Sequence, residues 1–355
     1  MKDLEHYAEI HPHLRRVACV EIKGGEEFVI HKGLVYIATK YGYNHQLCVV
    51  DISCPEKAVA KPDIEFKNAI ANLAIEGDTL FALESRRAIN FVDLSEPDKF
   101  NYFDCCLMLD KSMNDIAIIG DYAFVTMARE GVALIDISDL SQSKMIDSIK
   151  LDEGSAENIQ IIGDDIFVAC GAGGVRVFNI EQNKIVQKCV HQPEKCYVEK
   201  LYKMNNEIWA TNTRTSPESI MIIDSVTPSH LKSTFEPESK LPKGACFPLA
   251  GGLAIAFSLH YSVTAYAPQN NQSVELFGMF SRNINNEINS QAEYIEFPNG
   301  DNFSAEKMEE IDVPRSCLED VSCAKIRDGY LYATQGGYFN VYKITDDSVF
   351  KDVLL

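Results

Sequence analysis

The polar residues with the clearest chemical potential in this sequence recur along the chain at a nearly constant spacing. The spacing is 42 to 46 residues, apart from a last interval of 77, and the positions are Glu27, Asn72, Asp115, Asn158, Lys200, Cys246 and Cys323. Further carboxylates adjoin them at Glu157, Glu199, Glu319 and Asp320. A carboxylate such as Asp115 or Glu157 could act as a general base in catalysis. We expect these residues to come together as a polar ring.

Basic side chains occur in the segments that should lie above this ring, at His45, Arg86, Arg87, Arg129, Arg214 and His260. Guanidinium groups offer paired hydrogen bonds to a carboxylate or a phosphate. We therefore predict a binding site for an anion, and the candidate residues are Arg86, Arg129, Arg214, His260, Asp115 and Glu157. The alternative is that the arginines are solvated loop residues and that the polar ring only lines a wet channel.

No catalytic or cofactor motif accompanies these residues. The sequence has no G-x-S-x-G, no H-E-x-x-H, no P-loop and no cysteines at metal-site spacing. The glycine-rich segment Cys170–Gly174 should be a tight loop between strands, and His11 and His13 should be solvated. We therefore predict no metal and no cofactor, and it stays open whether the protein is an enzyme.

The elements that would position the candidate residues are β-strands in a repeat. The stretches 72–95, 115–138 and 158–181 each contain an alternating apolar strand, a Gly-Asp turn, a second strand, a polar loop and a third strand. Gly-Asp between two alternating runs indicates a tight hairpin. A fourth strand follows in most units, as at Lys144–Leu151. A period of about 40–50 residues with four strands is typical of a propeller blade.

The turns mark seven copies of this unit, at Lys32, Gly77, Gly120, Gly163, Asn205, Gly251 and Asp328. Four residues after each turn comes a bulky side chain, aromatic in six of the seven copies: Tyr36, Phe81, Phe124, Phe167, Trp209, Ile255 and Tyr332. We predict that these rings, including the single tryptophan, are buried between neighbouring blades. The sequence therefore predicts an all-β fold, a seven-bladed β-propeller with four antiparallel strands per blade.

The third strands resemble those of the LVIVD-repeat propellers, a family named after this segment. They read Leu47–Asp51, Ile89–Asp93, Ala133–Asp136, Val175–Asn179 and Met221–Asp224. The resemblance runs from about Arg15 to Ile344, and the sixth and seventh units depart most from the pattern. It implies the propeller architecture and almost nothing about function, because the repeat encodes packing and turns.

We predict one domain over residues 1–355, with blades at about 23–66, 67–109, 110–152, 153–193, 194–237, 238–282 and 315–355. A propeller leaves an unpaired edge unless its two chain ends share a blade. The strand at 15–22 should therefore close the ring beside Tyr338–Ile344, although Val349–Leu355 is a rival for that place.

Residues 283–314 form a predicted insertion between blades six and seven, with a short helix at Ser304–Ile311. This placement takes Val274–Phe280 as the fourth strand of blade six. If Ile311–Val313 is that strand instead, the insertion lies on the opposite face.

The charge balance restricts the partners. The chain has 52 acidic and 33 basic residues, a net charge of −19, and such a surface repels nucleic acid and anionic lipid. There is no apolar stretch of membrane-spanning length and no apolar core of a secretory signal near Met1. The eleven cysteines lack C-x-x-C pairs, which is typical of reduced thiols, so we expect a cytoplasmic protein.

Two classes of function remain. In the first, the protein is a non-catalytic platform that binds another protein or a small anionic ligand through the loops around the channel. In the second, it is an enzyme (a hydrolase, lyase or isomerase) acting on a small anionic substrate at the channel mouth, with a carboxylate as base and arginines as the anion clamp.

Overall fold

The computed structural model describes residues 14–344 with gaps. The gaps are residues 26, 39–45, 85–87, 97–100, 110, 195, 205, 213–218, 236–245, 250–252, 258–261, 268–271, 279–293, 297–301, 305–320 and 336. Contacts divide the chain into two compact units. The larger unit is residues 27–49 and 61–240, and the smaller unit is residues 1–26, 50–60 and 241–355.

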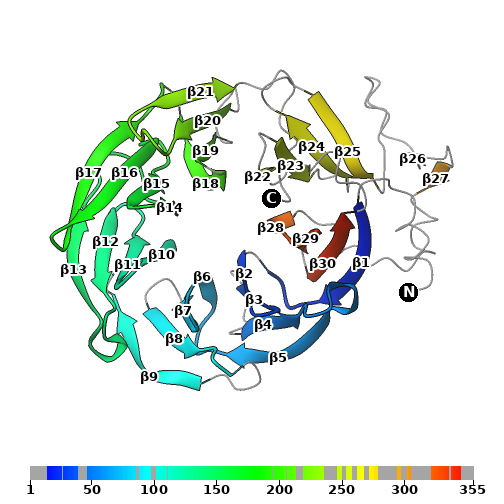
Figure 1. Cartoon of the computed structure of the whole chain (residues 1–355), viewed down its shortest axis with the longest axis horizontal. Helices are drawn as coiled ribbons and strands as arrows, with labels where there is room; N and C mark the ends of the chain where they lie inside the picture. Colours follow the sequence, from blue (N-terminus) through cyan, green and yellow to red (C-terminus); the bar gives the residue numbers. More distant parts are fainter. Residues whose placement is uncertain are drawn as a thin grey trace. The chain divides into compact units, whose positions relative to one another are not determined.

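The described residues form seven four-stranded sheets and one two-stranded hairpin, and the fold is an all-β propeller (Figure 1). Four sheets belong wholly to the larger unit. Their strands are β6 (Ile70–Glu76), β7 (Thr79–Glu84), β8 (Ala88–Asp93), β9 (Asn101–Met108), β10 (Asp115–Ile119), β11 (Tyr122–Thr126), β12 (Val132–Asp136), β13 (Lys144–Ile149), β14 (Asn158–Ile162), β15 (Asp165–Ala169), β16 (Val175–Glu181), β17 (Lys184–His191), β18 (Val198–Met204), β19 (Glu207–Asn212), β20 (Ser219–Asp224) and β21 (Leu231–Phe235). In each of these sheets the first strand lies innermost and the fourth outermost (Figure 1).

The remaining sheets have the same order of strands along the chain, with one exception. Their strands are β2 (Glu27–His31), β3 (Leu34–Ala38), β4 (Gln46–Asp51) and β5 (Val59–Glu65), then β22 (Cys246–Leu249), β23 (Leu253–Phe257), β24 (Ser262–Ala267) and β25 (Gln272–Gly278), and last β28 (Val321–Arg327), β29 (Tyr330–Gln335), β30 (Tyr338–Ile344) and β1 (Leu14–Glu21). Two short 3-10 turns, η1 (Pro55–Lys57) and η2 (Leu140–Gln142), follow third strands.

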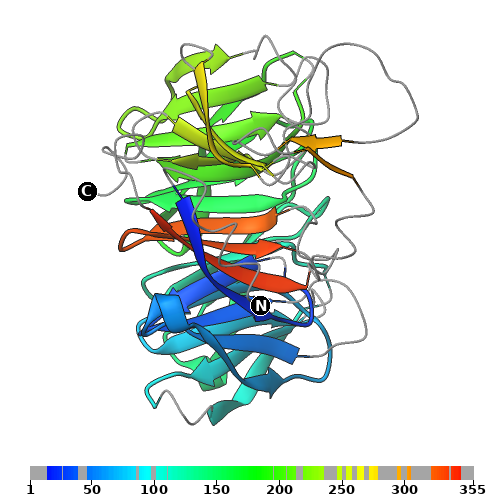
Figure 2. The ribbon, with the colours of Figure 1, turned by 90° about the vertical axis from the view of Figure 1, so that its right-hand side faces the viewer.

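The exception is the N-terminal strand, which joins the last sheet. β1 runs antiparallel to β30, with Leu14 opposite Ile344 and Glu21 opposite Tyr338 (Figures 1 and 2). The pairing predicted for residues 15–22 is therefore confirmed. The rival segment Val349–Leu355 lies outside the described residues.

In the segment predicted as an insertion, the described residues form a hairpin of β26 (Tyr294–Glu296) with β27 (Asn302–Ser304). Ser304, the expected start of a helix, ends β27, and the rest of that expected helix lies outside the described residues. β25 pairs with β24 as the fourth strand of its sheet, as predicted for this segment. Ile311–Val313, the alternative strand, lies outside the described residues.

Hairpin turns between first and second strands have the backbone that the repeat predicts. Gly120 has φ 56° and Gly163 has φ 60°, in the left-handed region where glycine carries no steric penalty. Lys32 adopts φ 46° at the same repeat position, and it is followed by a glycine with φ 78°. The turn geometry is thus kept where the first turn residue is not glycine.

The acidic residue that ends the third strand caps the turn that follows. Its Oδ1 accepts a hydrogen bond from the backbone N–H two residues later, at Asp51 (2.9 Å), Asp93 (2.9 Å), Asp136 (3.1 Å) and Asp224 (2.9 Å). Such side-chain turns replace the backbone hydrogen bond that the chain loses as it leaves the strand. The name-giving aspartate of the repeat is therefore a structural residue here.

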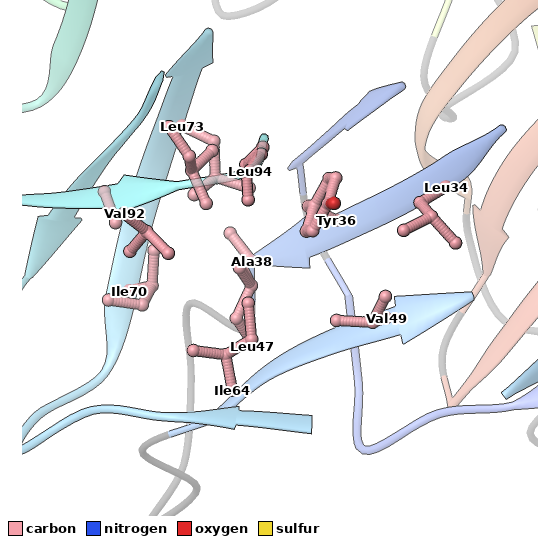
Figure 3. Close-up of a cluster of buried hydrophobic side chains, with 12 residues drawn as sticks. Leu34, Tyr36, Ala38, Leu47, Val49, Ile64, Ile70, Leu73, Val92 and Leu94 are labelled. Atoms are coloured by element: carbon pink, nitrogen blue, oxygen red, sulfur yellow. The ribbon is translucent and has the colours of Figure 1, made fainter. Parts of the chain in front are cut away.

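Apolar side chains fill the space between consecutive sheets. In one cluster, Tyr36 and Val49 from the sheet β2–β5 pack with Leu73 and Val92 from the sheet β6–β9 (Figure 3). All six predicted aromatic residues are buried, with exposed fractions of 2% or less. Trp209 is completely buried, as predicted, and its Nε1 donates to Glu207 Oε2 at 3.0 Å. The side chain of Ile255 lies outside the described residues.

Candidate functional site

The recurring polar residues on the innermost strands are joined by direct hydrogen bonds. The Nδ2 of Asn72 on β6 donates to Asp115 Oδ1 on β10 at 2.7 Å, and the Nδ2 of Asn158 on β14 donates to Asp115 Oδ2 at 2.6 Å. The backbone N–H of Leu201 on β18 donates in turn to Asn158 Oδ1 at 2.9 Å. Four neighbouring sheets are therefore tied together by one chain of side-chain contacts, which we call the amide–carboxylate chain.

The hydrogen bonds of this chain have a fixed direction. Each oxygen of Asp115 also accepts from a backbone N–H, Oδ1 from Ile116 and Oδ2 from Ile159, both at 2.8 Å. The Oδ1 of Asn72 is held by the N–H of Leu73 at 2.6 Å. Because backbone donors hold the asparagine oxygens, both asparagines can present only their N–H groups to residue 115. Only an acceptor with two oxygens satisfies all four donors.

Burial dominates the electrostatics of Asp115. The pKa of Asp115 is raised to about 7, mainly because the carboxyl is removed from water. The Glu27 carboxylate adds to this rise, and the hydrogen bonds from Ile159, Ile116 and Asn158 oppose it. Its side chain is almost inaccessible, with 6% of the residue surface exposed. A carboxylate in this position is a structural tie and is not open to a substrate.

Glu157, the second candidate base, is linked to Asp115 by Thr126, which hydrogen-bonds to the backbone of both residues. Thr126 Oγ1 accepts from the N–H of Asp115 at 2.9 Å and donates to the carbonyl of Glu157 at 3.5 Å. The Glu157 carboxylate is partly exposed and accepts from Asn114 Nδ2 at 3.0 Å. The structure therefore brings both predicted carboxylates to the same end of the sheets.

Arg129 lies at this end too, on the turn between β11 and β12. The turn is tight: the N–H of Glu130 donates to Met127, that of Gly131 donates to Ala128, and that of Ala156 also donates to Ala128 at 2.9 Å. Gly131 has φ 89°, and a Cβ there would lie 2.0 Å from the carbonyl oxygen of Ile149. These contacts fix the backbone path of the turn that carries Arg129.

The Arg129 side chain is exposed and makes no ion pair within the described part of the chain. Its neighbour Glu130 is engaged by Lys111 at 3.1 Å, and this contact, together with Lys150, holds the pKa of Glu130 below its usual range. The other predicted basic residues, His45, Arg86, Arg87, Arg214 and His260, lie outside the described residues, as do Glu319 and Asp320.

The glycine-rich segment 170–174 is a closed loop, as predicted. The N–H groups of Cys170, Gly173 and Gly174 donate within the segment, and that of Gly171 donates to Val198 at 2.9 Å. A phosphate cradle needs several N–H groups free to converge on the ligand. These four N–H groups already donate to backbone carbonyls, so they do not form a phosphate site.

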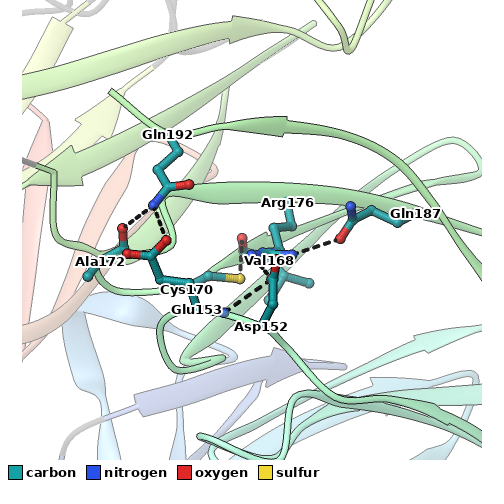
Figure 4. Close-up of polar contacts among 8 residues, drawn as sticks. All are labelled: Asp152, Glu153, Val168, Cys170, Ala172, Arg176, Gln187 and Gln192. Carbon is teal, nitrogen blue, oxygen red and sulfur yellow. Dashed lines mark hydrogen bonds and ion pairs between the residues drawn. The ribbon is translucent and has the colours of Figure 1, made fainter. Parts of the chain in front are cut away.

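Two buried polar clusters were not predicted from the sequence. On the sheet β6–β9, the buried Glu84 accepts from Asn68 and from Asn90 Nδ2. On the sheet β14–β17, the buried Arg176 contacts Asp152 and Gln187 (Figure 4). The sequence feature that could have revealed them is a polar residue inside an apolar third strand. Asn90 lies between Ile89 and Phe91, and Arg176 lies between two valines.

The described residues contain no cluster of three or more His, Cys, Asp or Glu side chains that could hold a metal ion. Among the same residues there is no helix with the length and apolar character needed to cross a bilayer.

Comparisons with known proteins identify the repeat and the fold. The LVIVD repeat profile matches residues 111–150, which span β10–β13, and the resemblance seen in the sequence is confirmed. No curated protein matches the sequence.

Several solved structures share the fold at low sequence identity. BamB from Moraxella catarrhalis has 12% identity and a TM-score of 0.59, with 93% of this chain and 98% of that chain covered. The β-propeller domain of Cps50 (Swd1) from Myceliophteria thermophila has 10% identity and a TM-score of 0.63, with coverage of 94% and 100%. The computationally designed Ika8 protein has 10% identity and a TM-score of 0.56, with coverage of 92% and 99%.

Proposed function

Since this chain is a β-propeller that carries the LVIVD repeat, we propose that it is a non-catalytic binding scaffold. Its partner is another protein or a small anionic ligand, recognised by the loops at the Asp115 end of the sheets. Propellers are commonly interaction scaffolds, because repeated sheets present many independent loops on one face. We name this surface the rim, and it includes Arg129 together with the predicted Arg86, Arg214 and His260.

The observation that carries this proposal is the set of four donors on Asp115. A general base needs an oxygen that can reach the proton of a substrate. Both oxygens of Asp115 are already used to hold neighbouring sheets together. The group best placed for catalysis thus serves the framework, and the exposed Arg129, on a tightly hydrogen-bonded turn, favours binding at the rim instead.

We also propose that the seven four-stranded sheets are the blades of one closed ring and that β1 completes the last blade. The pairing of β1 with β30 supports this, and so does the hydrogen bond of 2.7 Å from the N–H of Ile22 to the carbonyl of Gly337. We further propose a reducing, cytoplasmic environment, because buried free thiols such as Cys48 and Cys170 serve as core residues.

The test compares two variants of the full chain. Arg129→Ala removes the rim cation, and Lys144→Ala removes an exposed lysine at the opposite end of the same sheet. Tagged proteins are recovered from lysate, and bound proteins and metabolites are quantified by mass spectrometry. We expect a species that Lys144→Ala retains and Arg129→Ala loses by about fivefold, the effect of about 1 kcal/mol from an exposed charge pair. Equal retention by both variants would refute a binding role for Arg129.

A further inference from the structure

Arg176 is the most deeply buried basic residue whose contacts the structure describes. It projects from β16, and 6% of its surface is exposed. Its Nη1 donates to Gln187 Oε1 at 3.0 Å, and its Nη2 pairs with Asp152 Oδ1 (Figure 4). Its Nε is buried and has no hydrogen-bond partner in the described part of the chain.

Packing does not account for an arginine in this place. The equivalent residue of the preceding sheet is Ala133, which is completely buried. Removing a guanidinium from water is costly unless its donors are satisfied, and a single ion pair rarely compensates. A polar residue in an otherwise apolar strand, with no evident gain in stability, is a candidate for a functional role.

The guanidinium has one edge that is only half used. The N–H of Nε and one N–H of Nη2 lie parallel on the same edge, the one with which arginine grips both oxygens of a carboxylate or phosphate. Asp152 contacts Nη2 alone. The Cys170 thiol beside it offers no anion, because burial raises its pKa to about 12. Within the described residues, the Nε member of this pair of donors therefore has no acceptor.

The position of Asp152 allows its side chain to move away from Arg176 into solvent. Its side chain is 83% exposed, although the arginine it contacts is buried. It lies on the connector between β13 and β14, close to two fixed points. Leu151 is buried, and a Cβ on Gly154 would lie 1.9 Å from the carbonyl oxygen of Cys170. Asp152 can thus swing into solvent without moving the buried parts of the connector.

We propose that Arg176 is a binding site for a carboxylate group and that Asp152 occupies it as an internal substitute for the ligand. An incoming carboxylate displaces Asp152 and takes both Nη2 and Nε. This inference rests on the proposed binding function and deepens it, because the connector lies at the same end of the sheets as Arg129. It names the chemistry recognised there: a carboxylate from a small molecule or from an acidic side chain of a partner.

The test uses acetate, which has the same functional group as the side chain it would replace. Thermal unfolding of the full chain is measured at constant ionic strength near neutral pH while acetate replaces chloride. We expect a saturable rise in melting temperature for the natural protein, and a midpoint about tenfold lower for Asp152→Ala, in which the site is always open. Asp152→Asn, which keeps the size of the side chain, should lie between them.

Two controls make the result specific. Glu153→Ala removes the adjacent exposed carboxylate, which binds Gln192 at 2.9 Å and not Arg176, so its acetate response should equal that of the natural protein. Asp152→Ala/Arg176→Met should lose the response. An equal response in that double variant, or no gain in affinity for Asp152→Ala, would overturn the inference. Arg129→Ala should keep the acetate response, so failure here and failure of the rim proposal are distinguishable.

Discussion

Replacing Asp115 by asparagine should change how the stability of this protein depends on pH. The pKa of this buried carboxyl is raised from 3.8 to about 7 in the folded protein. The folded state therefore holds a proton that the unfolded chain has already released, and stability is greatest in acid and is lost as the pH rises through 7. For a shift of this size, the free energy of unfolding should fall by about 3 kcal/mol between about pH 5 and pH 8.

Asparagine resembles the protonated acid in shape and has no charge. Its amide nitrogen would, however, face two of the four N–H donors. Asp115→Asn should therefore be less stable than the natural protein by about 1–3 kcal/mol at low pH, and this difference should shift by about 3 kcal/mol in favour of the variant at high pH. The assay is urea unfolding at a series of pH values, followed by the fluorescence of the buried Trp209.

Asp147→Asn is the matched control for this experiment. Its carboxylate accepts from the N–H of Ile185 at 2.8 Å, and that bond holds its pKa below the usual range, so it should not alter the slope above about pH 5. Parallel curves for Asp115→Asn and the natural protein would refute the reasoning. They would show that the four hydrogen bonds on Asp115 outweigh its removal from water.

Three further predictions concern the framework. Trp209→Ala should lower the free energy of unfolding by about 3–5 kcal/mol, because it empties a completely buried site, and unchanged denaturant unfolding would contradict this. Deleting residues 1–22 should expose the edge of β30 and cause aggregation, measured by light scattering, whereas deleting residues 1–10 should not. A monomeric 23–355 fragment that unfolds cooperatively would rule out closure by β1. Gly131→Ala should lower the melting temperature, since its Cβ would meet the carbonyl of Ile149, while Gly77→Ala, with no atom within 4 Å, should cost less; equal losses would refute the packing argument.

The parts of the fold that depend on local chemistry could be predicted from the sequence. Gly120 and Gly163 mark turns because few other residues adopt positive φ, and the alternation around them gives the strands. Contacts between equal repeat positions of neighbouring sheets could be expected too, because the repeat places these positions side by side. Asn72 and Asn158, each 43 residues from Asp115, both donate a hydrogen bond to it.

The contacts that could not be predicted from the sequence are those made by residues on the connectors between sheets. Arg176 was seen only as a variant of an apolar strand, because its partner Asp152 lies on a connector whose course the repeat does not specify. The use of Asp115 also escaped prediction. A carboxylate in a ring looks like a catalytic group until the backbone N–H groups of Ile116 and Ile159 are seen to take its remaining lone pairs.

The direction of the amide–carboxylate chain limits which sheet can be duplicated in such an array. Two amides point toward one carboxylate, so the sheets β6–β9, β10–β13 and β14–β17 are not interchangeable at this position. A tandem copy of β10–β13 would set two buried carboxylates at neighbouring positions with no amide side chain between them, and they would repel each other. A copy of β14–β17 would instead place one asparagine beside another, which can continue the chain without an added charge. A chain extended by one four-stranded sheet should therefore tolerate a copy of β14–β17 better than a copy of β10–β13.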